Sequence, residues 1–195
     1  MNDSPSTNIV ILAAGASSRM GEHKLLLEVD GKTLLQRAAA TALEVSPEVL
    51  VVLGRDATRL SASLDGYSVR FVVNPDYANG KIQTSLQTAI AVLESRATLL
   101  MLADMPLISA AMLKSVVQIF LEQRPKIVAS RFGTVLAPPH LFAPELLAVL
   151  GTSGAKPLIM QHLEATVFLD WEKEKLFDVD TPQDFATLQK LFKVD

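Results

Sequence analysis

The sequence predicts an α/β fold, a Rossmann-like three-layer sandwich in which a mostly parallel, twisted sheet carries helices on both faces. Two observations support this prediction. First, apolar character is continuous rather than alternating in the short runs expected to form strands, which is typical of strands covered on both faces. Second, amphipathic segments of helical length separate these runs, and a strand, helix, strand repeat implies parallel strands joined by right-handed crossovers.

Five apolar runs are predicted strands, and three of the segments between them are predicted helices. The strands are expected at 9–12, 49–53, 69–73, 98–103 and 126–130. The helices are expected at 32–44, 81–94 and 109–122. These three segments have helical periodicity and contain no internal proline or glycine. Ligands of open parallel sheets bind beyond the carboxyl ends of the strands, so we expect the chemistry in the loops that follow them.

The pattern changes after residue 130. The stretches APPHLFAP (137–144) and GTSGAKP (151–157) interrupt it with proline and glycine, which predicts mixed strands and small helices beside the main sheet. A last helix is expected after Thr181, which can cap it, with Pro182 in its first turn. Its apolar stripe is expected to comprise Phe185, Leu188, Leu191 and Phe192.

Composition restricts the function. The 195 residues are 49% hydrophobic, which suits one domain, 1–195, with residues 1–8 as a flexible polar end. The net charge of −3 and the lack of like-charge runs argue against nucleic acid as a partner. The absence of cysteine excludes disulfides, thiolate zinc sites, iron–sulfur clusters and a cysteine nucleophile. Neither a secretion signal nor an apolar run near the roughly 20 residues of a membrane helix is present, so we expect a soluble, cytoplasmic protein that binds no membrane.

The loop after the first predicted strand suits an anion. Small side chains let successive backbone N–H groups turn toward a phosphate. These small residues are Ala13, Ala14, Gly15, Ala16, Ser17 and Ser18, and Leu12 just before them is a further nucleotide-binding candidate. Arg19 adds a planar fork of donors and Lys24 a compact charge, so a triphosphate can use both. The spacing differs from that of a P-loop, because Leu25 follows Lys24, and from the dinucleotide fingerprint, because Ser17 replaces its second glycine.

Two separated aspartates are candidate metal ligands. Asp104 follows the apolar run 98–103, and Asp180 precedes the last helix, two residues after Asp178. Magnesium binds hard oxygen ligands, often one or two carboxylates with water and phosphate. Each aspartate also has an ordinary structural interpretation, since Asp104 can start a turn before Pro106 and Asp180 can cap a helix.

The stretch LAAGASSRMGEHKLLL (12–27) resembles the signature of the MobA-like nucleotidyltransferases, most closely the branch that contains molybdenum cofactor cytidylyltransferase. The pattern of that branch is L-A-A-G-x-S-x-R-M-G-x-x-K-x-L-L, and every fixed position is met. The family also has a D-x-P turn and a D-x-D-T-P-x-D motif, which map onto Asp104 and onto Asp178 and Asp180. The resemblance implies a nucleotide-diphospho-sugar transferase-like fold.

The resemblance also assigns roles to residues. It implies that Arg19, Lys24 and Asp104 are catalytic and that Asp104 and Asp180 bind Mg²⁺, with Mn²⁺ as the alternative ion; Asp178 supports these ligands. A further family arrangement lies in NPDYANGKIQTS (74–85), where Asn74, Gly80 and Ser85 are implied to lie near the nucleotide. The helix N-terminus there favours negative charge. Residues 131–180 are implied to form the acceptor side.

The implied reaction is transfer of CMP from CTP, or a related nucleoside triphosphate, to the terminal phosphate of molybdenum cofactor (molybdopterin), with release of pyrophosphate. A molybdoenzyme or its chaperone is an implied partner. Ala137 stands where relatives usually have glycine and Thr152 where they usually have aspartate, so the acceptor stays open. The alternatives are a sugar phosphate or other small phosphate as acceptor, and a nucleotide-binding accessory protein that serves molybdoenzyme maturation or purine catabolism.

The remaining polar and sulfur-containing residues receive structural interpretations. The three histidines, His23, His140 and His162, share no metal-ligand spacing and are expected at the surface. Met112 and Met160 are expected in the core of predicted helices. Trp171 lies in a charged turn and receives no role.

Overall fold

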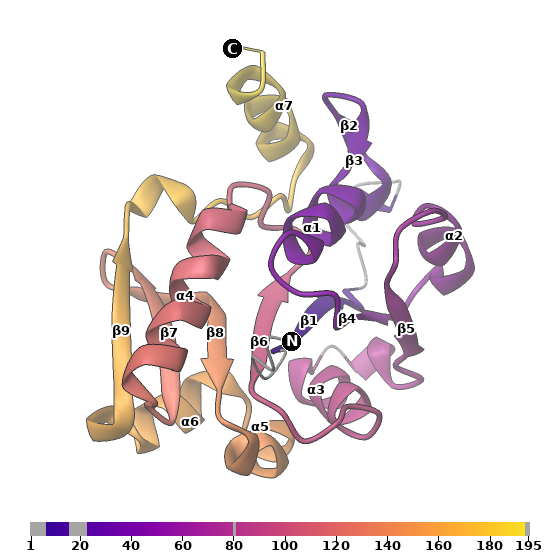
Figure 1. The fold of residues 1–195 in the computed structure, drawn as a ribbon. Helices are drawn as coiled ribbons and strands as arrows, with labels where there is room; N and C mark the ends of the chain where they lie inside the picture. The colour runs from indigo at the N-terminus through magenta and orange to yellow at the C-terminus, as the bar shows by residue number, and fades with distance from the viewer. Residues whose placement is uncertain (1–6, 16–22, 80, 194–195) are drawn as a thin grey trace.

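A seven-stranded sheet forms the centre of the molecule in the computed structural model, which describes residues 7–15, 23–79 and 81–193. Its order is β5-β4-β1-β6-β8-β7-β9 (Figure 1). The strands are β1 (Asn8–Ala13), β4 (Val49–Leu53), β5 (Arg70–Val73), β6 (Thr98–Leu102), β7 (Ile127–Phe132), β8 (Val135–Phe142) and β9 (Thr166–Trp171). A small separate hairpin comprises β2 (Glu28–Val29) and β3 (Lys32–Thr33).

The sheet is mostly parallel, as predicted. Strand β1 pairs in parallel with both β4 and β6, β4 pairs in parallel with β5, and β7 does so with β9. Only β8 runs antiparallel, between β6 and β7. We expected mixed strands and small helices beside the main sheet after residue 130. Both are present, but the placement was wrong, because β8 and β9 are strands of that sheet. The turn at Gly133, whose φ is +61°, lets β8 return directly along β7.

Helices cover both faces of the sheet. The α-helices are α1 (Leu34–Leu43), α2 (Ala57–Ala62), α3 (Ile82–Ile90), α4 (Ala110–Gln123), α5 (Leu147–Ser153), α6 (Ala155–Gln161) and α7 (Pro182–Leu191). Short 3-10 turns are η1 (Lys24–Leu26), η2 (Tyr77–Asn79), η3 (Pro144–Leu146), η4 (Leu163–Ala165) and η5 (Lys173–Lys175). The three helices predicted in the first two thirds are present, each shorter or shifted by a few residues.

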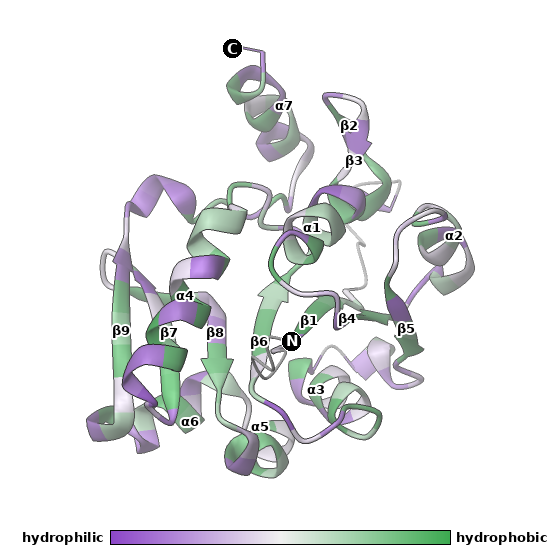
Figure 2. Cartoon of the chain, viewed as in Figure 1, coloured by the Kyte–Doolittle hydropathy of each residue, from purple (hydrophilic) through white to green (hydrophobic). Residues whose placement is uncertain are grey.

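Two apolar clusters hold the layers together. Because alternate side chains of a strand point to opposite faces, Ile9 and Ile11 of β1 pack with α1 and α4, whereas Val10 and Leu12 pack with α3, α5 and α6. Figure 2 shows mostly green strands at the centre of the sheet, whereas the helices mix green and purple segments. This two-sided burial explains why the predicted strands are apolar throughout, and it confirms the α/β prediction.

The edge strand β5 departs from that expectation. Its run VRFVV looks like a strand covered on both faces, but Phe71 and Val73 are 41% and 51% exposed. The strand pairs only with β4, so one of its sides lacks a neighbouring strand. Met160 of α6 is also wrong as a core prediction, since it is 53% exposed, whereas Met112 is buried.

The last helix begins as predicted. The Thr181 side chain accepts a hydrogen bond from the backbone N–H of Asp184, and the Asp184 carboxylate accepts one from the N–H of Thr181. Within the apolar stripe Leu188 is fully buried, while Leu191 is half exposed. In the ranges that the structure describes, we find no helix of the length and apolar character that membrane crossing requires.

Candidate active site

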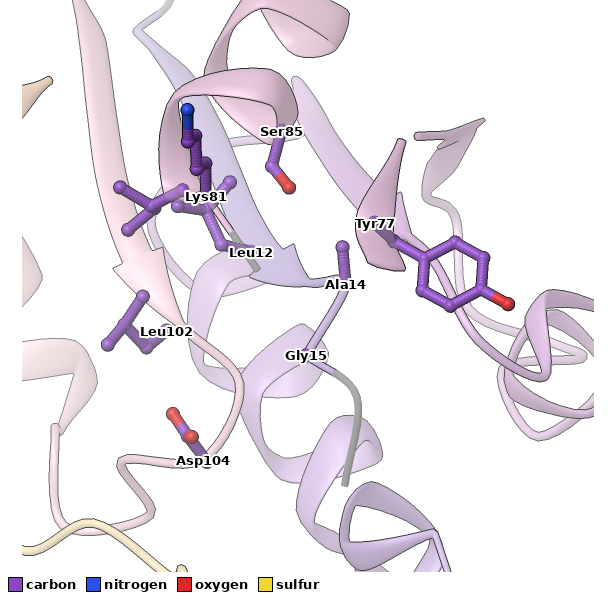
Figure 3. A pocket seen from close by; sticks show the side chains of 9 residues that line it. Leu12, Ala14, Gly15, Tyr77, Lys81, Ser85, Leu102 and Asp104 are labelled. Carbon is purple, nitrogen blue, oxygen red and sulfur yellow. The ribbon is translucent and has the colours of Figure 1, made fainter. Parts of the chain in front are cut away.

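A cavity of about 250 Å³ lies at the carboxyl ends of β1 and β6. Figure 3 shows its lining side chains, which come from the end of β1, the loop after β6, the η2 turn and the start of α3. The residues are Leu12, Ala14, Gly15, Tyr77, Lys81, Ile82, Ser85, Leu102 and Asp104. The predicted nucleotide residues Leu12, Ala14, Gly15 and Ser85 therefore share one cavity with the predicted catalytic Asp104, while Ala13 is buried at the end of β1.

The backbone at Gly15 is open on the side of the cavity. Among the described residues, no atom lies within 4 Å of a Cβ atom added at Gly15, so they leave room for a ligand to approach this backbone closely. The neighbouring Gly54, in contrast, is required for packing. A Cβ atom there falls 2.8 Å from the Ala14 carbonyl oxygen and 2.8 Å from the Cβ of Tyr77. Gly54, directly after β4, thus packs closely against the backbone of Ala14.

Lys24, Asp104 and Asp180 converge although they are far apart in the sequence. The Lys24 Nζ lies 2.6 Å from the Asp104 Oδ2 and 2.7 Å from the Asp180 Oδ1. The backbone holds the two acidic segments together, because the Val179 N–H donates to the Asp104 carbonyl oxygen at 3.1 Å. Asp180 is not the helix cap that its position also permits, since Thr181 has that role.

The electrostatics of this cluster favour an ionised lysine. Burial of the ammonium acts to lower the pKa of Lys24, but the Asp104 and Asp180 carboxylates outweigh this effect and raise the pKa above its ordinary value. Partial burial and the carboxylates of Asp104 and Asp180 raise the pKa of Asp178 to about 6. The residue itself is exposed at its surface, so repulsion from the Asp104 and Asp180 carboxylates contributes more to this raised pKa than burial does. Lys24 thus contacts Asp104 and Asp180, and Asp178 adds a third acidic group to the cluster.

The cluster fits a divalent ion bound through few protein ligands. Two carboxylates converge on one cation, and Mg²⁺ typically uses one or two carboxylates while water and phosphate complete its shell. Over the described ranges no group of three or more histidine, cysteine, aspartate or glutamate side chains has the geometry of a metal site. A site closed entirely by such side chains is therefore not present in these ranges.

Asn74 lies behind the cavity wall. Its side chain amide donates to the hydroxyls of Thr84 and Ser85, both at 3.0 Å, and its carbonyl oxygen accepts from the Asp76 N–H at 2.9 Å. Asn74 is 1% exposed and is absent from the cavity lining, whereas Ser85 is part of it. The structure thus brings Ser85 to the cavity and places Asn74 one layer deeper.

Four of the predicted site residues lie outside the described ranges: Ser17, Ser18, Arg19 and Gly80.

The cavity is also lined by residues that were not predicted as site residues: Tyr77, Lys81, Ile82 and Leu102. Lys81 and Ile82 directly follow Gly80 in the sequence of the family arrangement, and that position was a usable signal. For Leu102 the sequence offers no such signal, because it ends a strand whose apolar residues all resemble core residues.

The histidine prediction was wrong for two of the three residues. His23 and His140 are only 4% and 3% exposed. Burial lowers the pKa of both, that of His140 to about 3. The His140 Nδ1 accepts from the Ser130 N–H at 3.1 Å, and the Trp171 Nε1 donates to the Ser130 hydroxyl at 2.9 Å. Trp171 therefore connects β9 to β7 and does not lie in a free charged turn.

The two departures from the family pattern lie away from the described cavity. Ala137 is part of β8 and packs against the core from a partly buried position. Thr152 is near the end of α5, where its hydroxyl donates to the Val149 carbonyl oxygen at 3.0 Å. Neither residue lines the cavity, so neither changes the site around Lys24 and Asp104.

Comparisons with known proteins find relatives that match nearly the whole chain. Molybdenum cofactor cytidylyltransferase from Escherichia coli (strain K12) is 26% identical over 94% of this chain and 95% of its own length. Nicotine blue oxidoreductase from Paenarthrobacter nicotinovorans is 29% identical over 98% of each. The solved structure of Rv0371c from Mycobacterium tuberculosis H37Rv superposes with a TM-score of 0.82 at 24% identity, over 95% of this chain and 98% of that one, and its manganese complex does so at 0.71.

The family model described as the MobA-like NTP transferase domain matches residues 9–166, most of the chain. That range contains Lys24, Asp104 and every described residue of the cavity, and it ends before Asp180. The match confirms the predicted nucleotidyltransferase class. The chain belongs to the MobA-like NTP transferase family.

Proposed function

We propose that this protein transfers CMP from CTP to the terminal phosphate of molybdenum cofactor, with release of pyrophosphate. The single observation that carries the proposal is the convergence of Lys24, Asp104 and Asp180 beside the open backbone of Gly15. CTP and this acceptor are adopted from the E. coli relative, whose name specifies a molybdenum cofactor cytidylyltransferase. They also agree with the LAAG signature.

The proposed chemistry needs no protein nucleophile. A phosphate oxygen of the acceptor attacks the α-phosphorus of CTP in line, a new oxygen–phosphorus bond forms, and the bond to the β-phosphate oxygen breaks as pyrophosphate leaves. The acceptor phosphate is ionised near neutral pH, so no general base is required. The task of the protein is positioning and charge stabilisation. Lys24 stabilises charge near the α-phosphate, and the backbone around Gly15 holds the outer phosphates, together with Arg19 of the same motif.

Asp104 and Asp180 are the residues proposed to hold a divalent ion, Mg²⁺ or Mn²⁺. Such an ion neutralises charge on the phosphate oxygens when it is bound. The described residues supply two carboxylates for it, and substrate phosphate and water are the remaining ligands expected for Mg²⁺. Both ions belong in the assay, because the related fold of Rv0371c was solved in complex with manganese.

The experiment is a pyrophosphate-release assay with Mg²⁺, CTP and a panel of acceptors. The panel contains freshly released molybdenum cofactor, a sugar phosphate and an alditol phosphate. We expect release that depends on the cofactor, and its loss in Asp104→Asn. The matched control is Asp65→Asn, which changes an exposed aspartate after α2. Release with a sugar phosphate alone replaces the acceptor in this proposal.

A second candidate function is nucleotide binding without transfer. The P. nicotinovorans relative matches over nearly its full length, and its name is that of an oxidoreductase. A similar chain of this length therefore carries the name of an activity other than nucleotidyl transfer. Tight CTP binding without pyrophosphate release from any acceptor favours this second candidate. The presence of both carboxylates on Lys24 argues for transfer, because a binding protein does not need two metal ligands.

A further inference from the structure

The ammonium of Lys24 lies between the two carboxylates that are proposed to hold a divalent ion. It donates to the Asp104 Oδ2 at 2.6 Å and to the Asp180 Oδ1 at 2.7 Å, so one oxygen of each carboxylate already has a cationic partner. An ion that Asp104 and Asp180 share also has to lie between them. The lysine and the ion therefore require the same place.

Two cations at this place oppose each other. Mg²⁺ binds carboxylate oxygens at about 2.0–2.1 Å and demands a nearly ideal octahedral shell. An ammonium held by the same carboxylates faces the ion at short range, where like charges repel strongly. The Lys24 side chain is only 11% exposed, so solvent and salt screen this repulsion poorly.

Lys24 can leave the carboxylates while its backbone stays in place. The η1 turn fixes that backbone, because the Leu26 N–H donates to the His23 carbonyl oxygen and the Leu27 N–H donates to the Lys24 carbonyl oxygen. The charge itself sits at the end of a flexible four-carbon stem. A change of side-chain rotamer is thus enough to move the ammonium away from Asp104 and Asp180.

Asp104 connects this exchange to the cavity. Figure 3 shows its carboxylate on the loop after β6, across from the Gly15 backbone, and both residues line the cavity. A triphosphate beside Gly15 offers the Lys24 ammonium phosphate oxygens in place of the carboxylate oxygens that it leaves. Arrival of the nucleotide therefore favours release of the two carboxylates.

We propose that Lys24 and the divalent ion occupy the two carboxylates in turn, and that the nucleotide drives the exchange. Without nucleotide the lysine holds Asp104 and Asp180, and the ion binds weakly. With nucleotide the lysine turns to the phosphates, and the ion takes its place. This inference rests on the proposed function, in which the two carboxylates are metal ligands, and deepens it by coupling the binding of ion and nucleotide.

The test is the affinity for Mn²⁺ without nucleotide, measured by calorimetry. Lys24→Met should bind Mn²⁺ at least about tenfold more tightly than wild type, because the ion no longer displaces a charged hydrogen-bond donor. The gain should disappear when Asp104→Asn is added. The matched control is Lys81→Met, which removes the same charge from an exposed lysine of the cavity. Its Mn²⁺ affinity should stay within about twofold of wild type, because solvent screens an exposed charge.

A measurement on wild-type protein separates exchange from mere repulsion, and it does not depend on the folding of Lys24→Met. The Nζ signal of Lys24 is followed by NMR with ¹⁵N-labelled lysine and is assigned by its loss in Lys24→Gln. Saturation with Mg²⁺ and CTP should move this signal, because the ammonium changes its partners. A signal that stays in place while both are bound shows that lysine and ion share the carboxylates, and it overturns the inference.

The outcomes also separate this inference from the proposed function. Equal Mn²⁺ affinity in wild type and Lys24→Met, an equal gain in Lys81→Met, or a gain that survives Asp104→Asn overturns the inference alone. Absence of Mn²⁺ binding in every variant overturns it together with the assignment of the metal ligands. If Lys24→Met gains affinity but wild-type protein releases no pyrophosphate with any acceptor, the proposed function fails and the competition between lysine and ion stands.

Discussion

Removal of the Lys24 ammonium tests the charge cluster most sharply. In Lys24→Met the carboxylates of Asp104 and Asp180 lose the cation that both contact, at 2.6 and 2.7 Å. The Asp104 side chain is 23% exposed and that of Asp180 is 53% exposed, so the first contact contributes most of the stability. A hydrogen bond to a charged group contributes about 1.5–3 kcal/mol. We expect Lys24→Met to lower the free energy of unfolding by about 2 kcal/mol.

The double variant gives the decisive comparison. Asp104→Asn alone leaves Lys24 with Asp180 and is expected to cost about 1 kcal/mol. In Lys24→Met combined with Asp104→Asn, the most buried unpaired charge is gone, so the total loss should be about 1 kcal/mol smaller than the sum of the single losses. Urea denaturation at pH 7 measures all three variants, with Lys114→Met, an exposed lysine of α4, as the control. Strictly additive losses would show that the lysine and the carboxylate do not interact in solution.

Three other predictions concern ligands and pH. CTP should bind weakly when a chelator removes divalent ions, because Asp104 and Asp180 repel the bare triphosphate; equal calorimetric affinity with and without chelator refutes this. Thermal shifts should be larger with CTP than with GTP, because the methyl group of Ala14 narrows the cavity for a purine; the reverse order refutes it. The pKa of His140 falls from 6.5 to about 3 on burial, so the unfolded chain binds more protons between these values. Stability should therefore drop as the pH is lowered through this window, by up to about 5 kcal/mol, and His140→Gln should show a shallower drop; an identical pH profile contradicts the assignment.

The strands were predictable because each depends on local pattern. Apolar runs gave β1, β4 and β6, and the same runs located Asp104 at a strand end. Pattern alone says nothing about which strand lies at an edge, so the exposure of Phe71 and Val73 in β5 was not foreseen. The position of β8 between β6 and β7 likewise depends on contacts between residues distant in sequence, and no local sequence pattern predicts it.

The site shows the same division. The candidates Lys24, Asp104 and Asp180 followed from motifs, but their meeting at one ammonium depends on contacts across the whole chain. The burial of His23 and His140 depends on neighbours distant in sequence, and single histidines carry no signal for it. Asn74 was expected to lie near the nucleotide, and only the structure reveals that its amide is fully engaged by Thr84, Ser85 and Asp76.

The central claim is attack at the α-phosphorus of CTP, and the fate of a radioactive label tests it most directly. Wild-type protein is incubated with Mg²⁺, molybdenum cofactor and CTP labelled at either the α- or the γ-phosphate. We predict that the α-label moves into a cytosine dinucleotide of the cofactor while the γ-label appears in pyrophosphate, and that Asp104→Asn abolishes both. Release of the γ-label as inorganic phosphate, with the α-label left in CDP, would contradict the account.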